Sequence, residues 1–357
     1  MVKINRKKIR LFYSYDPVVI GYVVIGLIFS RIYNFEINWL ILFDFKYDLV
    51  LLKVTSIALL IFLPLYYLGI RLKGKSGPLE SIKASLIYMK DRFLNCASLF
   101  EFFRILAALK IVMTIHCTVK QAIPIINPAL YDDILWKIDK FIHFGFSPTL
   151  LSLKLFSATD ITSFIDFTYI IWYFLKIPFF IIFIWFVDQK KRDHFFSAYF
   201  LLWVIGGLSA VLFPSVGPVY KYPDLFAGLN IPHASELQKQ LWIHYNGILL
   251  HPENFRAFVY EGVAAFPSLH VAVIALFCIF SRELNKIFFI SMLCYTVIVQ
   301  AGSVHLGWHY AVDGYFGVLL AFSCYFVTMR LSGDSFAARP GKNLAGKAVN
   351  PEHSQAT

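Results

Sequence analysis

Long apolar runs constrain this chain more than any other feature of its sequence. A helix needs roughly 20 apolar residues to cross a bilayer, and runs of about that length recur along the 357 residues. We place candidate spans at 17–34, 48–69, 98–120, 160–187, 194–213, 267–281, 286–303 and 311–330. Since helices satisfy their backbone hydrogen bonds inside the hydrocarbon, the sequence predicts an all-α fold, a polytopic membrane helix bundle with about eight transmembrane helices.

The composition favours the same class of protein. Hydrophobic residues make up 58% of the chain and charged residues 15%, whereas soluble domains carry about 25% charge. The net charge of +11 is better explained by cytoplasmic loops that face anionic lipid than by nucleic-acid binding. We therefore expect a membrane and no nucleic acid as partner, and we leave the oligomeric state open. The five cysteines lie in or beside apolar segments without metal-ligand spacing, which favours an inert role.

Basic residues orient the predicted spans. They gather in five segments, at 3–10, 71–92, 190–192, 282–286 and after 330. Alternating spans place all five segments on one side, which the positive-inside rule makes cytoplasmic. The segments 120–160, 214–266 and 303–312 then lie on the extracytoplasmic face, periplasmic or lumenal.

The predicted organisation has three parts. Residues 1–97 hold an N-terminal cytoplasmic tail, two extra transmembrane helices and a basic loop, 98–330 form the membrane domain, and 331–357 read as a disordered cytoplasmic tail. Near 128–145 apolar residues recur at helical spacing opposite Asp132, Asp133, Lys137 and Lys140, which predicts an amphipathic helix in the interface. The outer loop 214–266 is long for a connector, and long ordered loops are often functional.

Two short strings carry the chemistry. Phe266-Pro267-Ser268-Leu269-His270 opens one span, where a serine caps free backbone N–H groups and the helix N-terminus attracts an anion. His309-Tyr310-Ala311-Val312-Asp313 opens the last span, and its histidine and aspartate share one helical face. Each string alone also fits a structural role, as a capped helix start or as a His–Asp pair that locks two helices. Together they predict two histidines and one carboxylate at one end of the bundle.

These strings resemble the second and third motifs of the type 2 phosphatidic acid phosphatase superfamily. That family shows Pro-Ser-x-x-His or Pro-Ser-Gly-His, then Ser-Arg-x5-His-x3-Asp. The inositol-phosphorylceramide synthase-like branch, with Phe-Pro-Ser-Leu-His and His-Tyr-x-Val-Asp, is the more similar. The stretch 212–218 and the pattern from Asp133 to Pro148 are similar to a proline-rich segment and an interfacial helix of that branch. The resemblance covers about 98–330 and implies a six-helix core without metal or cofactor.

The resemblance also implies roles for single residues. His309 would be the nucleophile that forms a phosphohistidine, Asp313 would orient it, and His270 would be the general acid. Ser268 and neighbouring N–H groups would hold phosphate oxygens.

The chain departs from the phosphatase pattern in two places. Ser303 stands where the third motif has arginine, and we do not find the first motif, Lys-x6-Arg-Pro. A phosphodiester carries less charge than a phosphomonoester and needs fewer cations, so the missing arginine favours a diester donor. We expect Ser303, Lys221 and Arg256 at the substrate, the last two as replacement cations, although both also fit solvated charges.

Three functions remain open at this point. The first is a phosphotransferase that moves a phosphorylated head group from a phospholipid or prenyl-phosphate-type donor to a hydroxyl acceptor, as in sphingolipid or glycolipid synthesis. The second is a lipid phosphate phosphatase with the same residues and water as acceptor. The third is a transporter or scaffold whose His–Asp pair relays protons or locks helices.

Overall fold

The computed structural model describes residues 10–72, 77–255 and 262–331. The described part is helical and contains no strand, and its elements run in the following order: α1 (Asp16–Tyr33), η1 (Trp39–Phe43), α2 (Lys46–Leu72), α3 (Pro78–Arg92), α4 (Cys96–Gln121), α5 (Ile123–Ile126), α6 (Asp132–Ile142), α7 (Pro148–Phe156), α8 (Thr159–Ile181), η2 (Ile182–Phe186), α9 (Gln189–Leu212), α10 (Pro218–Lys221), η3 (Pro223–Leu225), α11 (Ser235–Leu250), η4 (Pro252–Asn254), α12 (Leu269–Ser281), α13 (Lys286–His305) and α14 (Ala311–Leu331).

The prediction of a polytopic helical bundle is confirmed. Seven helices of the described residues are long and apolar enough to cross a membrane, and α12 is a shorter apolar helix. Each of the eight falls on one of the predicted spans. The tail predicted at 331–357 lies, apart from its first residue, outside the described residues.

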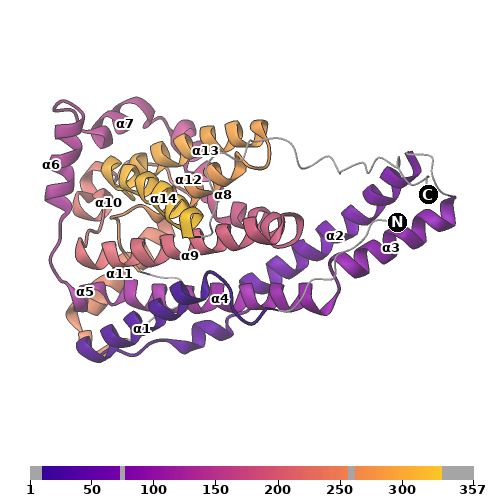
Figure 1. The fold of residues 1–357 in the computed structure, drawn as a ribbon. Helices are drawn as coiled ribbons and strands as arrows, with labels where there is room; N and C mark the ends of the chain where they lie inside the picture. Colours follow the sequence, from indigo (N-terminus) through magenta and orange to yellow (C-terminus); the bar gives the residue numbers. More distant parts are fainter. Residues whose placement is uncertain (1–9, 73–76, 256–261, 332–357) are drawn as a thin grey trace.

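Helix α12 lies at the centre of the bundle. It packs against α9, α13 and α14, and its residues from Val271 to Phe277 are buried. Figure 1 shows these helices side by side, with α4 and α1 along one flank. Polar N-caps set where several helices begin, for example Asn95 before α4, Asp188 before α9 and Asn285 before α13. The start of α12 is therefore held rigidly inside the bundle.

Charged residues inside α4 join it to three other helices. Glu101 pairs with Arg192 of α9 at 2.7 Å, and Arg104 pairs with Asp16 of α1 at 2.6 Å. Lys110 pairs with Asp48 of α2 at 2.8 Å. A charge in a low-dielectric interior is costly unless it is paired, so these contacts fix how α1, α2 and α9 meet α4.

Helix α2 begins beside the middle of α4 and runs outward together with α3. Figure 1 shows this pair extending beyond the other helices. Most large side chains of α2 are exposed, as are Leu60, Ile61 and Leu65. The part of α2 that packs on the core runs from Leu51 to Phe62.

The structure adds detail to two segments that the sequence places outside the spans. The amphipathic helix is α6, which crosses one end of the bundle (Figure 1). Asp132 is buried against protein rather than solvated on the charged face, while Ile134 and Phe141 are exposed. The segment 214–266 is no plain loop, because it contains the helix α11, whose Leu241 and Tyr245 pack on Val216.

Candidate active site

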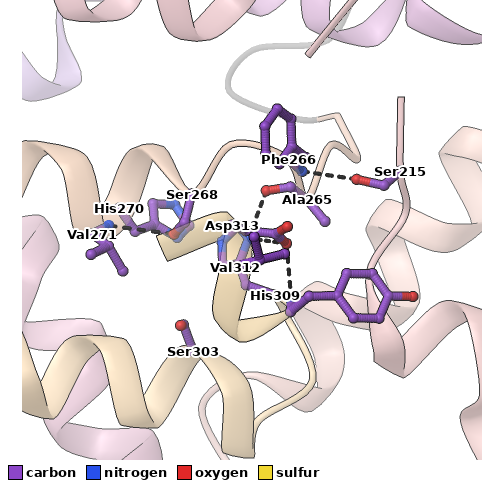
Figure 2. A network of polar contacts seen from close by, with 12 residues as sticks. Ser215, Ala265, Phe266, Ser268, His270, Val271, Ser303, His309, Val312 and Asp313 are labelled. Carbon is purple, nitrogen blue, oxygen red and sulfur yellow. Dashed lines mark hydrogen bonds and ion pairs between the residues drawn. The ribbon is translucent and has the colours of Figure 1, made fainter. Parts of the chain in front are cut away.

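His309 lies in the short turn between α13 and α14, where its backbone is held by a hydrogen bond from its N–H to the Ser303 carbonyl (3.1 Å). Its side-chain Nδ1 lies 2.7 Å from the carbonyl oxygen of Ala265, as Figure 2 shows. A carbonyl only accepts, so Nδ1 carries the hydrogen and donates it. The Nε2 lone pair is therefore left for a nucleophilic attack.

The carboxyl group of Asp313 bonds the backbone of the turn, whereas the resemblance implied that it would orient the His309 ring. Its Oδ2 lies 3.6 Å from His309 Nδ1, too far for a hydrogen bond, and accepts one from the Tyr310 N–H at 2.9 Å. The tautomer of His309 is thus set by the Ala265 carbonyl. Asp313 fixes the backbone that follows His309 and places its carboxyl group beside the ring.

His270 lies in the first turn of α12 and faces His309. The two ring centroids are 5.7 Å apart, with the planes at 83°. Its Nδ1 lies 2.6 Å from the Tyr169 hydroxyl, and Trp172 stacks on its ring at 4.4 Å. With Nδ1 engaged by Tyr169, Nε2 is the nitrogen left to exchange a proton with a substrate oxygen.

Both histidines line one cavity of about 310 Å³. Most of its wall is apolar and comes from α4, α8 and α9, and Lys120 and Lys176 line it together with the histidines. Among the residues that the structure describes, neither lysine has a carboxylate partner; Lys176 lies over the rings of Trp172 and Tyr173 at 4.9 and 3.9 Å. Besides His116 of α4, the cavity wall therefore holds His270, His309 and two lysines without a carboxylate partner among the described residues.

Burial controls the charge of His309. Desolvation lowers its pKa to about 3, with a smaller contribution in the same direction from the positive charge of Lys120, while the Ala265 hydrogen bond acts the other way. The ring is therefore neutral at pH 7, the state that a nucleophilic nitrogen requires.

Two of the residues expected at the substrate, Ser303 and Lys221, lie away from the cavity in the structure. The Ser303 hydroxyl donates to the Gln300 carbonyl of its own helix at 2.8 Å and does not line the cavity. In Figure 2, Ser303 lies apart from the two histidines. Lys221 pairs instead with Asp133 at 3.1 Å on the surface, where hydrogen bonds from Lys221 and Tyr222 keep the pKa of Asp133 below its usual value. Arg256 lies outside the described residues.

Ser268 lies close to the histidines but is engaged. It is fully buried, its hydroxyl accepts a hydrogen bond from the Val271 N–H at 3.4 Å, and its own N–H donates to the Asp313 carbonyl at 3.1 Å. The first bond caps α12, and the second joins the start of α12 to the start of α14, which brings His270 and His309 to the same place.

Two buried aspartates of α6 join the segments that carry the site. Asp139 accepts hydrogen bonds from the N–H groups of Ala311 and Val312, at 2.8 and 2.7 Å, and so caps α14. Asp132 accepts from the Val216 and Gly217 N–H groups and from the Tyr310 hydroxyl at 2.9 Å. Both side chains are therefore anchors of the His309 turn.

The segment 214–218 forms the other side of this anchor. The Ser215 hydroxyl accepts a hydrogen bond from the Phe266 N–H at 2.9 Å, and the Ser215 carbonyl accepts one from Ala265 (Figure 2). Gly217 adopts φ +93°, and a side chain there would meet the Trp308 carbonyl. Hydrogen bonds from the Ala265 N–H and the Phe266 N–H to Ser215 thus fix the peptide group whose carbonyl accepts from His309.

Comparison with protein families matches residues 133–327, more than half of the chain, to the PAP2 superfamily. The chain belongs to the PAP2 superfamily. The match contains His270, His309 and Asp313, and membership supports an activity of the phosphatase or phosphotransferase type. No curated protein and no solved structure matches the chain.

The sequence around Lys120 contains a pattern that could have identified this lysine as part of the site. Lys120 is followed after six residues by Asn127-Pro128, which is the spacing of the first PAP2 motif with asparagine in place of arginine. The Asn127 amide donates to the Val211 carbonyl at the end of α9 (3.0 Å) and so has a structural role. No sequence pattern marks Lys176, because its place on the cavity wall depends only on how α8 packs against α12.

Among the described residues, no group of three or more histidine, cysteine or acidic side chains is arranged to hold a metal ion.

Proposed function

We propose that this chain is an integral-membrane phosphotransferase that moves a phosphorylated head group from a phosphodiester lipid to an acceptor hydroxyl through a phosphohistidine on His309. The observation that carries the proposal is the pairing of two histidines with Lys120 and Lys176 on the wall of one largely apolar cavity. The histidines supply a nucleophile and an acid, the lysines offset phosphate charge, and the wall accepts a lipid.

The proposed reaction has two steps. First, His309 Nε2 attacks phosphorus, the P–N bond forms, and the P–O bond to the donor lipid's alcohol breaks while His270 gives that oxygen a proton. Second, the acceptor hydroxyl gives its proton to His270 and attacks phosphorus, which forms the new P–O bond and releases His309. The first step replaces an oxygen at phosphorus by the His309 nitrogen, and the second step replaces that nitrogen by the acceptor oxygen. After both steps His309 is free and His270 has regained its proton, so the enzyme returns to its starting state.

The cations favour a diester donor. Asn127 and Ser303 stand where the PAP2 patterns have arginines, and a guanidinium is the group that binds two oxygens of a phosphomonoester at once. Lysine is a compact point charge, which suits a phosphodiester with its single negative charge.

The placement of charge along the chain supports an extracytoplasmic site. The basic segments that include Lys190 and Arg282 lie at the opposite helix ends from His309, and the positive-inside rule assigns such segments to the cytoplasm. In this orientation the reaction takes place on the periplasmic or lumenal face.

A lipid phosphate phosphatase is the second candidate. The observation that favours it is that the cavity has two lysines without acidic partners among the described residues, and two positive charges would match a phosphomonoester dianion. In that reaction water replaces the acceptor alcohol in the second step.

Purified protein in lipid nanodiscs separates the two candidates. We would compare phosphatidic acid with a phosphodiester lipid such as phosphatidylinositol, each with and without diacylglycerol or ceramide as acceptor. The phosphotransferase predicts a labelled product that appears only when donor and acceptor are both present. Rapid phosphate release from phosphatidic acid, with no acceptor dependence for any diester, would instead establish the phosphatase.

A further inference from the structure

We infer that the N-terminal segment formed by η1 and the first turns of α2 is one wall of an acyl-chain slot that begins at the two histidines, and that this wall sets the chain length of the lipid donor. The segment precedes residues 133–327, which match the PAP2 superfamily. The inference rests on the proposed function in one respect, namely that the donor is a lipid.

The first observation is the extent of the cavity. One part of it is lined by Lys120, His270 and His309, and another part by Lys110 and Asp48, beyond which Leu106 continues the wall along α4. Between these two groups the lining is mainly apolar, and η1 and α2 contribute Ile41, Val50 and Leu51 to it. One continuous space thus joins the phosphate chemistry to side chains of the N-terminal segment.

The second observation is the distance along α4 between Lys120, which lies beside the histidines, and Lys110, which lies beside the N-terminal segment. Lys110 and Lys120 are ten residues apart on the straight helix α4, which is about 15 Å at the helical rise of 1.5 Å per residue. The hydrocarbon core of a bilayer is about 30 Å thick. The slot therefore matches the depth of one leaflet, as expected for a chain whose phosphate lies at the membrane surface.

The third observation is an ion pair on the cavity wall where α2 meets α4. Lys110 Nζ lies 2.8 Å from Asp48 Oδ2 and donates to the Asp44 carbonyl, and both charged side chains are only 15% exposed. This pair pins α2 to α4. Because Leu51 follows Asp48 by one helical turn, the pair also holds Leu51 against the slot, where it is 5% exposed.

These observations assign the apolar wall to a lipid chain. A phosphorylated lipid has an anionic group and an alkyl chain. The lysines beside the histidines match the anion, and the apolar wall matches the chain. The chain passes Ile41 and Leu51, so the volume of these side chains limits how many methylenes fit. A longer or branched chain would meet the Lys110–Asp48 pair.

The test narrows the slot at Leu51 and compares donors of short, medium and long acyl chain. Leu51→Trp is matched by Leu49→Trp on the same helix turn, since Leu49 is 52% exposed and does not line the cavity. Displacing two methylenes from the slot lowers kcat/KM by about tenfold. We expect Leu51→Trp to lose at least about tenfold with the long-chain donor while the short-chain donor is turned over as by the parent protein.

A second variant covers the case in which tryptophan disturbs folding. Leu51→Ala widens the slot and should shift the preference towards longer or branched chains. Equal losses for all chain lengths in a folded Leu51→Trp protein, or an unchanged preference in both Leu51 variants, would overturn the inference.

A binding measurement keeps the inference separate from the proposed reaction. The His309→Ala protein, which forms no phosphohistidine, is irradiated with a phosphodiester lipid that bears a diazirine at the end of its acyl chain. We expect cross-links at Ile41, Val50 or Leu51, and their loss in Leu51→Trp. Cross-links confined to exposed residues such as Leu49 would overturn the slot. If the cross-links occur but the parent protein makes no product, the proposed reaction fails and the slot stands.

Discussion

At the scale of single residues, the tautomer of His309 is the feature on which the chemistry depends. The Ala265 carbonyl takes the Nδ1 hydrogen at 2.7 Å, so Nε2 is free without help from a carboxylate. Asp313 lies 3.6 Å away and bonds the Tyr310 N–H. In the proposed reaction, this carboxyl group beside the ring would stabilise the cationic imidazole that forms as the nitrogen attacks phosphorus.

His309→Ala should abolish turnover, with a loss of at least about 10⁴-fold, because no other nucleophile replaces Nε2. Asp313→Asn keeps an acceptor for the Tyr310 N–H but removes the charge, so we expect a smaller loss, roughly 10²- to 10⁴-fold. Acid-labile labelling by a radioactive donor measures phosphohistidine directly. Normal labelling of a folded His309→Ala protein would rule out the proposed nucleophile.

His270→Ala should slow the first step by about 10²- to 10⁴-fold, since it removes the proton donor of the leaving alcohol. The defect should shrink with a donor whose leaving group is an acidic phenol, because that group departs without a proton. The two donors are compared by single-turnover kinetics. The same defect for both would show that His270 binds substrate or supports structure without acting as the acid.

The pH dependence follows from the lowered pKa of His309, about 3. An ordinary histidine of pKa about 6.5 loses about 25-fold of its neutral form between pH 7 and pH 5. A histidine with a raised pKa would become charged as the pH falls from 7 to 5. The pKa of His309 is lowered, so its ring stays neutral until the pH approaches about 3. With the acidic-leaving-group donor, phosphoenzyme formation should therefore change by less than about twofold over this interval. A steep decline with a midpoint near pH 6.5 would contradict the buried, neutral ring.

At the scale of elements, α6 is the helix that holds the site together. Asp132 and Asp139 are seven residues apart, on one face, and accept hydrogen bonds from the segments around Gly217 and Val312. Burial raises the pKa of Asp139, against the lowering effect of its two backbone hydrogen bonds. Its charge also faces the N-terminus of α14, where a negative group is stabilising.

Asp139→Asn should destabilise the protein by about 1–3 kcal/mol, because an amide presents only one acceptor to two N–H groups and loses the charge. Activity should fall further than the loss of folded protein explains, since α14 begins two residues after His309. The matched control is Asp133→Asn on the exposed side of the same helix, which should alter neither property much. Thermal unfolding and kcat, measured on both variants, check this; equal behaviour of the two would refute the anchoring role.

At the scale of the whole molecule, eight apolar helices bring the histidine motifs to one end of the bundle. α12 leaves that end and α13 returns to it, so the two motifs meet although 39 residues separate His270 from His309. The N-terminal helices are joined to this bundle by partly buried ion pairs, Arg104 with Asp16 and Lys110 with Asp48.

Cysteine labelling in cells tests the orientation. In a background in which the exposed Cys96 and Cys294 are replaced by serine, Ser235→Cys in α11 should react with an impermeant thiol reagent on intact cells or sealed lumenal-side-out vesicles. Lys190→Cys at the start of α9 should react only after permeabilisation, because basic segments face the cytoplasm. Labelling of both positions from one side would refute the eight-span topology.

Local patterns were enough for the fold class and for the members of the histidine pair. Apolar runs of span length follow from the energetic cost of backbone groups in lipid, and the strings at 266–270 and 309–313 lie where helices begin. The amphipathic spacing of α6 was also visible, because a helix of period 3.6 separates its faces along the chain itself.

Tertiary structure decided which polar groups surround the histidines. Lys120 and Lys176 reach the cavity because α4 and α8 pack beside α12, Lys221 is drawn to Asp133, and the Ser303 hydroxyl bonds within its own helix. The face of α6 that carries Asp132 turned inward because its carboxylate meets free N–H groups there. Such choices depend on pairs far apart in the chain, and composition and period contain no information on which partner lies across an interface. The sequence by itself therefore determined the helices and the two histidine motifs, and the packing determined the tautomer and the surroundings of the histidines.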